Sequence, residues 1–372
     1  MSRRIFFCLF LFFFGILYNS IASESRQENN MKKESVSQKE DGAYYGDNPF
    51  GVLEFLHWNH PWNHYKYGDE KDLKKSVALM KESGVGWVRM DFLWSDIEPE
   101  ASKFEFAKYD YIVDLLSENN IHILGLLNYS ADWASTCGKW NCPPLDNNLF
   151  TNYAVKIVQR YKGKIKHWEV WNEPDSSTYW TDQDSLKSYC ILLKDVYIAL
   201  KEVDPDCKIL NGGLANGIAS VNHLYDNGAK GYFDILNLHF FESPLNPDAI
   251  KRVIVFPKLA YKVMARNQDG DKKIWITEIG CPGVKRGLKV NNWWMGNNPN
   301  EAEQAKWLKD VFTSLTREKF VEKVFWAFFR DTKEHWNNGV DYFGLLRWDF
   351  TRKPAFLTYK KCFNDWKRSQ RH

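Results

Sequence analysis

Two carboxylates in this sequence each close an apolar, aromatic run: Glu173 in WEVWNEPD and Glu278 in KKIWITEIG. Each run is typical of a short buried strand, and Pro174 ends the first because proline cannot continue a β-ladder. A carboxyl group at such a strand end is either a solvated loop charge or a group at the mouth of a pocket. Two of them across one mouth suit the cleavage of a glycosidic bond, in which one carboxyl protonates the leaving oxygen and the other attacks the anomeric carbon.

Other polar and aromatic side chains stand at the ends of predicted strands and could complete such a site. The candidates are Asn172, Arg89, His239, Trp326, His57 and Trp58. We expect Arg89 to hold Glu278 ionised, and we expect burial and the nearby negative charge to raise the pKa of Glu173. The alternatives are a salt bridge between Arg89 and Asp91, a structural role for the histidine, and core packing for Trp326.

Three histidines fall in one loop, HWNHPWNH, after the first predicted strand: His57, His60 and His64. Histidine is a common metal ligand, but this spacing fits no helical metal motif. We therefore predict that the loop offers its histidines, Trp58 and Trp62 to sugar hydroxyls, and we expect no metal and no organic cofactor. Four further tryptophans follow the third and seventh strands and either line the same groove or pack on one another. They are Trp133, Trp140, Trp293 and Trp294.

These side chains need a scaffold, and apolar strands alternate with amphipathic helical patterns along the chain. The predicted strands cover residues 50–56, 86–92, 121–127, 165–172, 207–213, 234–240, 272–280 and 323–329. Helical spacing is clearest in residues 72–84, 150–163 and 353–366. This alternation predicts an α/β fold, a single-domain (β/α)8 TIM barrel, whose functional groups lie at the carboxyl ends of the strands. An open doubly wound sheet, the alternative, would need a glycine-rich turn after its first strand, which is missing here.

Side-chain alternation gives a direction to each residue of the fourth strand. Strict alternation along WEVWNE points Glu169, Trp171 and Glu173 into the barrel and their neighbours toward the helices. Asn172 would then point away from the pocket unless the strand bends at its end, which Pro174 favours.

The composition is that of a globular protein with unusually many aromatic residues. The net charge of +3 is too small to indicate a nucleic-acid partner. The 17 Trp, 18 Tyr and 25 Phe residues form either a bulky core or a groove that stacks on flat sugar faces.

The first residues have the pattern of an export signal. A basic MSRR precedes an apolar run and small residues, which predicts a signal peptide at 1–22 with cleavage after Ala22. An uncleaved anchor is the alternative. A polar arm at 23–48, the barrel at 49–366 and a tail at 367–372 would follow. We expect a secreted or periplasmic protein without stable membrane insertion after cleavage.

Export would place the remaining cysteines in an oxidising compartment. They are Cys137, Cys142, Cys190, Cys207, Cys281 and Cys362. The first two bracket CGKWNC and could close a small loop, although the sequence leaves the pairing open. A zinc site is disfavoured because no second close pair completes a tetrahedral set. Cys281, three residues after Glu278, is interpreted as structural.

WEVWNEP, WITEIG, VRMDFLW and FGLLRWDFTRKPAF together resemble a clan A glycoside hydrolase, with family 39 the most similar and family 5 second, over residues 50–366. The resemblance implies a retaining β-glycosidase in which Glu173 is the acid/base and Glu278 the nucleophile. It also implies that Asn172 touches the sugar hydroxyl next to the reacting carbon and that Arg89 supports the nucleophile. In retaining enzymes the two carboxyl groups lie about 5–5.5 Å apart.

The same resemblance places His239 near the nucleophile and makes Trp326 a stacking platform. Family 39 xylosidases carry an additional β-rich domain, whereas this chain ends after its predicted eighth helix. We therefore expect a single-barrel member that acts on an exopolysaccharide, with the sugar, the linkage and endo or exo action left open. A carbohydrate-binding barrel without turnover and a transglycosylase with the same residues are the alternative functions.

Overall fold

The computed structural model describes residues 48–60 and 67–370, and they form a closed barrel of eight parallel strands in chain order, β1 to β8. The strands are β1 (Phe50–Leu53), β2 (Trp87–Leu93), β3 (His122–Asn128), β4 (His167–Asn172), β5 (Lys208–Gly213), β6 (Ile235–His239), β7 (Lys273–Ile279) and β8 (Val321–Ala327). Each predicted strand is present, with ends that differ by a few residues. The prediction of a (β/α)8 barrel is confirmed.

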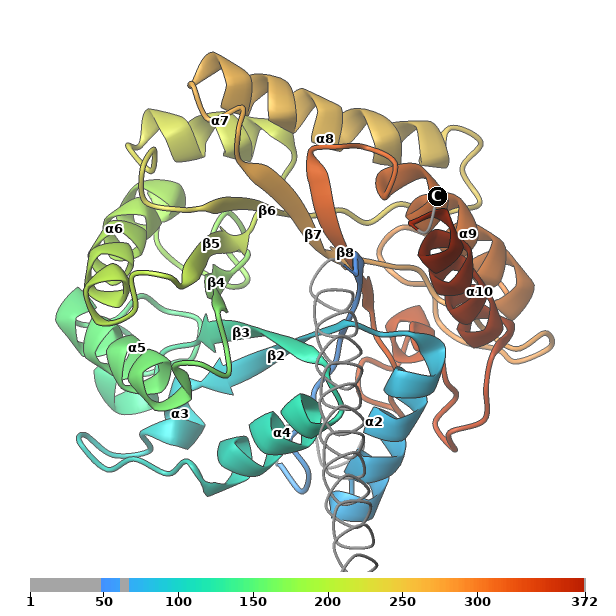
Figure 1. Cartoon of the computed structure of the whole chain (residues 1–372), viewed down its shortest axis with the longest axis horizontal. Coiled ribbons are helices and arrows are strands. Elements are labelled where there is room, and N and C mark those ends of the chain that lie inside the picture. The colour runs from blue at the N-terminus through green and yellow to red at the C-terminus, as the bar shows by residue number, and fades with distance from the viewer. Residues whose placement is uncertain (1–47, 61–66, 371–372) are drawn as a thin grey trace, which may run out of the picture. The chain divides into compact units, whose positions relative to one another are not determined.

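Helices surround the strands on all sides (Figure 1). They are α2 (Glu70–Ser83), α3 (Trp94–Ile97), α4 (Ala107–Glu118), α5 (Asn147–Tyr161), α6 (Ser185–Val203), α7 (Ile218–Asp226), α8 (Ala249–Arg266), α9 (Glu301–Leu315) and α10 (Pro354–Ser369), with short 3₁₀ turns at Asp132–Ala134 and Gly339–Tyr342. Local signals set their ends. Asp69 accepts hydrogen bonds from the first backbone amides of α2, and Gly84 ends that helix with a φ of 86°.

Large apolar side chains fill the barrel toward the amino ends of its strands. The cluster consists of Trp87, Leu124, Leu210, Ile235, Trp275 and Phe325. The rings of Trp87 and Trp275 lie 5.0 Å apart across it. Because this end is packed solid, a substrate can enter the barrel only from the carboxyl ends of the strands, where Glu173 and Glu278 stand.

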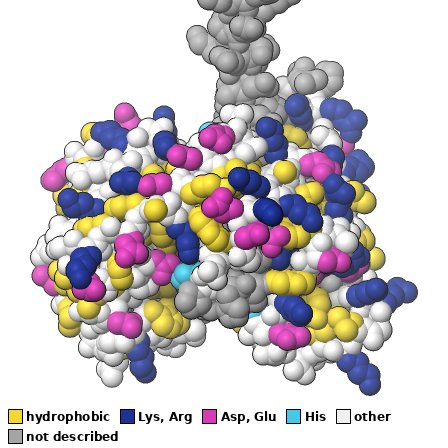
Figure 2. Space-filling view, turned by 90° about the horizontal axis from the view of Figure 1, so that it is seen from below, with side chains coloured by type: hydrophobic (Ala, Val, Ile, Leu, Met, Phe, Trp, Pro, Cys, Tyr) yellow, Lys and Arg dark blue, Asp and Glu magenta, His cyan; other side chains and the backbone are white. Residues whose placement is uncertain are grey.

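The surface carries charges of both signs. Figure 2 shows Lys and Arg side chains interspersed with Asp and Glu over the face in view, in keeping with the small net charge. Within the described part of the chain, none of the helices combines the length and apolarity that crossing a membrane requires. The predicted signal peptide and residues 23–47 of the polar arm lie outside the described residues, and helix α10 continues to Ser369, beyond the expected barrel end at residue 366.

Candidate active site

The end of β4 departs from strict alternation, which corrects one expectation. Trp171 and Glu173 have φ values of 68° and 43°, in the left-handed region that non-glycine residues rarely adopt. As a result the Trp171 ring packs outward, 5.7 Å from Phe150 of α5, while Asn172 turns inward to Arg89. The inward direction expected of Trp171 is therefore wrong, whereas Asn172 turns inward through a bend at the strand end, as its predicted place in the site required. The bend begins at Trp171, three residues before Pro174.

Arg89 on β2 connects the carboxylates of the site. Its guanidinium donates to both oxygens of Glu169, at 2.6 and 2.9 Å, and to Glu278 at 2.6 Å. It also donates to Asn172 Oδ1 at 2.8 Å. Arg89 and Glu169 are both buried, so the ion pair is shielded from water. Asp91, the alternative partner, instead accepts a hydrogen bond from Asn128.

His239 at the end of β6 was expected near Glu278, and its nearest carboxylate is Glu173. Its Nδ1 lies 2.8 Å from Glu173 Oε1 and 3.8 Å from Glu278. Its Nε2 lies 3.0 Å from the Thr277 hydroxyl, which itself donates to Asn237. Since that hydroxyl proton is used, Nε2 must be the donor to Thr277. The contact between Nδ1 and Glu173 then holds one proton, on either partner.

A glycine makes room for this histidine. A Cβ at Gly213, the last residue of β5, would lie 2.0 Å from His239 Nε2. The backbone amide of Gly213 also donates to Glu169. Only a residue without a side chain therefore allows β5 to approach both groups.

The two candidate catalytic carboxylates are close together. One oxygen of Glu173, one oxygen of Glu278 and a ring nitrogen of His239 all lie within 4.8 Å of one another. That is far below the roughly 6.5–9.5 Å of inverting glycosidases and near the separation of retaining ones.

Burial changes the protonation of this cluster. Burial raises the pKa of Glu278, an effect that His239 and Arg89 oppose and that Glu173 reinforces. Burial alone would lower the pKa of His239, but Glu278 and the hydrogen bond to Glu173 raise it overall. Burial also raises the pKa of Asp91, to about 6. Glu278, His239 and Asp91 therefore keep their protons to higher pH than the same side chains would in water.

A cavity of about 450 Å³ reaches this cluster at Glu278, whereas Glu173 and His239 are not among the residues that line it. Arg89, Asp91, Asn172 and Glu278 form its polar floor. Six aromatic residues stand in its walls: Phe55, Tyr129, Trp140, Tyr179, Phe328 and Trp336. Phe328 and Trp336 stack at 5.5 Å with nearly parallel rings. A polar floor between aromatic walls matches the two sides of a sugar, its hydroxyl groups and its apolar faces.

Several predicted residues lie outside the cavity lining. Trp326 is fully buried and donates through Nε1 to the carbonyl of Phe343, so it offers no face to a sugar, contrary to the predicted stacking role. His57 is buried against Tyr109, and Trp58 packs on Tyr111 of α4. Neither position suits the expected sugar contact.

Of the remaining loop residues predicted to line the groove, some line the cavity and others do not. His60 lines the cavity and pairs with Asp96 at 2.9 Å, whereas Trp62 and His64 lie outside the described residues. Trp140 lines the cavity, but Trp133 donates its indole proton to the Glu98 carbonyl. Trp293 is buried and Trp294 is exposed.

Some site residues were not predicted. Glu169 was expected to point inward but was given no function. A carboxylate that points into a barrel needs a buried cation as its partner, and Arg89 is that cation. This requirement is the signal by which Glu169 could have been predicted. Tyr179, Phe328 and Trp336 carry no motif in the sequence and reach the cavity only through the path of their loops.

The group formed by Glu173, His239 and Glu278 could also be considered as a metal site, because two carboxylates and an imidazole offer suitable ligand atoms. However, the guanidinium of Arg89 already lies 2.6 Å from Glu278, and a second cation beside it would be repelled. The donor set therefore suits proton sharing better than metal binding.

One disulfide joins Cys137 and Cys142, the pair that brackets CGKWNC. Cys190, Cys207, Cys281 and Cys362 are free thiols. Burial raises the pKa of Cys281, so the thiol stays protonated and inert, as expected of a structural cysteine.

Comparison with protein families gives two matches. The model of a family described as "Glycosyl hydrolase catalytic core" matches residues 119–346, more than half of the chain. A model described as "Beta-galactosidase" matches residues 64–127.

Individual proteins are similar over shorter stretches. Endo-1,4-beta-xylanase A of Phanerodontia chrysosporium is 28% identical over 122 residues, 31% of this chain and 29% of the xylanase. Phospho-cellobiase of Klebsiella oxytoca is 26% identical over 113 residues, 28% of this chain and 24% of the relative. The matched stretch thus spans less than a third of either relative.

Solved structures share the fold over most of the chain. A family 39 glycoside hydrolase from Bacteroides cellulosilyticus WH2 superposes with a TM-score of 0.66 at 23% identity, over 86% of this chain and 64% of the other. A family 39 enzyme from Xanthomonas axonopodis pv. citri gives 0.62 at 19%, over 84% and 65%. The predicted resemblance to clan A glycoside hydrolases is confirmed, and the two family 39 enzymes share the fold of this chain.

Proposed function

The chain belongs to the family of glycosyl hydrolase catalytic cores, and we propose that it is a retaining β-glycosidase acting on an oligo- or polysaccharide. The observation that carries this proposal is the approach of Glu173 and Glu278 to within 4.8 Å, with Glu278 in the lining of an aromatic cavity. At that separation no water molecule fits between the sugar and the second carboxylate, which therefore attacks the sugar itself.

In the first step Glu278 attacks the anomeric carbon while the bond from that carbon to the leaving oxygen breaks. The proton held between Glu173 and His239 moves to the leaving oxygen. Arg89 keeps the attacking carboxylate ionised and oriented. Asn172 is held through Oδ1 by Arg89, so its Nδ2 is the atom that donates to a sugar hydroxyl.

In the second step a water molecule enters in place of the leaving group. Glu173 with His239 takes one proton from the water, and the water oxygen bonds to the anomeric carbon. The ester bond to Glu278 breaks and its carboxylate is restored. Two inversions at one carbon leave the configuration unchanged.

The charges in the cavity favour a neutral sugar. Among the described lining residues, the Lys and Arg class is represented by Arg89 alone, and its guanidinium is engaged by Glu169 and Glu278. A uronic acid would need a cation of its own beside Asp91 and Glu278. We also propose export through the predicted signal peptide, because a polysaccharide substrate is met outside the cell.

A panel of 4-nitrophenyl β-glycosides tests this function. We expect release of nitrophenol from at least one neutral glycoside among the xyloside, glucoside, galactoside and mannoside, and little from the glucuronide. Proton NMR of the first product should show the β-anomer before mutarotation. An initial α-anomer would contradict the retaining mechanism, and added methanol would reveal any transglycosylase activity as methyl β-glycoside.

Replacing His239 should change the pH dependence of the reaction. Because His239 stabilises the proton shared with Glu173, the basic limb of the kcat/KM profile should move to lower pH in His239→Gln. The acid limb reports Glu278 and should move to higher pH, because His239 no longer opposes the rise in the pKa of that carboxyl group.

His223→Gln is the matched control, since this histidine is exposed on α7. Both pH profiles are measured with the best aryl glycoside of the panel. A basic limb that stayed in place in His239→Gln would show that the histidine has only a structural function.

A further inference from the structure

The loop that follows β3 contains the disulfide and ends in the wall of the cavity. We propose that the Cys137–Cys142 disulfide holds Trp140 as a platform for a second sugar unit, next to the unit that Glu278 attacks. The inference rests on the proposed glycosidase function and adds a substrate-binding site to it.

Trp140 has the position of a binding residue and not that of a core residue. Its side chain lines the cavity, yet 45% of its surface is exposed. Its ring packs edge-on against Tyr129, 4.8 Å away, and Tyr179, 6.1 Å away. An exposed indole fixed by two aromatic neighbours offers a rigid apolar surface to a sugar ring.

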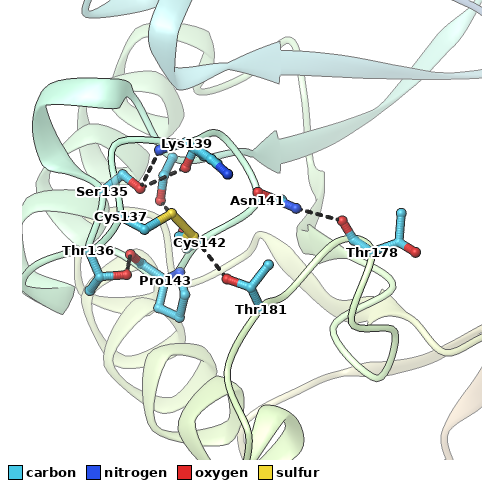
Figure 3. The surroundings of a disulfide bond; sticks show 10 residues. Ser135, Thr136, Cys137, Lys139, Asn141, Cys142, Pro143, Thr178 and Thr181 are labelled. Carbon is cyan, nitrogen blue, oxygen red and sulfur yellow. Dashed lines mark hydrogen bonds between the residues drawn. A yellow bond between two sulfur atoms is a disulfide. The ribbon is translucent and has the colours of Figure 1, made fainter.

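The disulfide and a set of hydrogen bonds fix the backbone on both sides of Trp140 (Figure 3). Ser130 donates through its amide to the carbonyl of Trp140 and through its hydroxyl to that of Cys142. Ser135 donates to the carbonyl of Lys139 and accepts from its amide. The loop is therefore a closed ring that carries the tryptophan.

The same ring is attached to the segment that follows Glu173. Asn141 donates to the carbonyl of Thr178, and the amide of Thr181 donates back to Asn141. The Thr181 hydroxyl contacts Cys142 Sγ at 2.9 Å. The platform and the segment that follows the candidate acid/base are thus held in one frame (Figure 3 shows the two threonines).

The cavity has room for more than the reacting sugar. Its volume of about 450 Å³ falls in the range of roughly 300–1,000 Å³ that accepts drug-sized ligands. Arg89, Asn172 and Glu278 occupy the floor at which one sugar reacts, so a platform in the wall serves a neighbouring unit. Opening the disulfide would leave the short loop to be ordered on binding, which weakens affinity without touching the reacting groups.

Two substrates separate sugar binding at Trp140 from bond cleavage at Glu278. β-Xylosyl fluoride has a single-atom leaving group and spans only the reacting sugar, whereas xylotetraose also reaches the platform. If the enzyme prefers the glucoside in the panel, β-glucosyl fluoride and the corresponding glucose tetraose replace these two substrates. We expect Trp140→Ala and the double variant Cys137→Ser/Cys142→Ser each to raise KM for the tetraose about tenfold. The kcat for the tetraose and the kinetics of the fluoride should not change.

The combined triple variant should be no worse than Trp140→Ala, because the disulfide acts through the indole. Dithiothreitol should raise KM of the wild type but not that of Trp140→Ala; the other cysteines of the described chain are already free thiols. Trp294→Ala, a second exposed tryptophan, is the control and should behave as wild type.

An unchanged KM in Trp140→Ala, an equal loss with the fluoride, additive effects in the triple variant, or the same loss in Trp294→Ala would each overturn the proposal. If the wild type hydrolyses neither fluoride nor any glycoside of the panel, the proposed glycosidase function is what fails.

Discussion

Glu278→Ala should lose at least about 10⁴-fold in kcat on an aryl β-glycoside, because the covalent intermediate can no longer form. Sodium azide should restore turnover, since the shortened side chain leaves space for a small anion at the face from which Glu278 attacks. The restored product should be the α-glycosyl azide, formed by a single inversion. Initial rates with 4-nitrophenyl glycoside and NMR of the azide adduct measure both effects.

Glu173→Ala gives the complementary result if the assignments are correct. The variant should still form the intermediate from a substrate with a good leaving group, and azide should then attack the intermediate and yield the β-glycosyl azide. The stereochemistry of the two azides thus assigns nucleophile and acid/base independently. Exchanged configurations would reverse the two assignments, and unchanged rates in both variants would refute the mechanism.

Glu242→Gln is a suitable control for these variants, because this buried carboxylate pairs with Arg252 and is not part of the cavity lining. Its activity should remain near the wild-type level. Oligosaccharide binding by Glu278→Gln, followed by calorimetry, separates an enzyme from a carbohydrate-binding barrel: binding should persist while turnover is lost.

Arg89→Met should destabilise the protein by about 3–5 kcal/mol, as expected when one partner of a buried ion pair is removed. The substitution keeps a similar side-chain volume but leaves Glu169 buried beside Glu278 without the guanidinium that joins them. Urea denaturation followed by tryptophan fluorescence measures the loss.

The double variant Arg89→Met/Glu169→Gln isolates the electrostatic part. Removing the second charge should recover a clear part of the lost stability, because an amide is far less costly to bury than an unpaired carboxylate. Activity should stay low, since Glu278 still lacks its cation. A double variant no more stable than Arg89→Met would show that packing, and not charge, accounts for the effect of Arg89.

The sequence allowed the scaffold to be predicted nearly completely. Strands and helices follow from local periodicity, so the eight strands and the barrel they form were predictable from apolar runs alone. The positions of Glu173 and Glu278 at strand ends follow from the same signal, because Pro174 after the first run and Gly280 after the second mark where the ladder stops.

The directions of side chains beyond the regular strands were less predictable. Alternation holds only while φ stays in the β region, and the left-handed φ of Trp171 exchanges the directions of that residue and Asn172. Similarly, Trp326 and Phe328 are two residues apart in one predicted strand and both are largely buried, yet only Phe328 lines the cavity. Nothing local distinguishes them, since the choice depends on what packs against β8.

By itself, the sequence determined the barrel, the edge of the sheet that carries the chemistry, and the two carboxylates that stand there. Tertiary structure alone decided that His239 pairs with Glu173 and that Arg89, the expected partner of Glu278, also pairs with Glu169. It also decided that a disulfide-closed loop carries Trp140 into the cavity wall. The physical reason is that periodicity and strand-end signals act between near neighbours in the chain, whereas hydrogen-bond partners are selected by distances between strands and loops far apart in sequence.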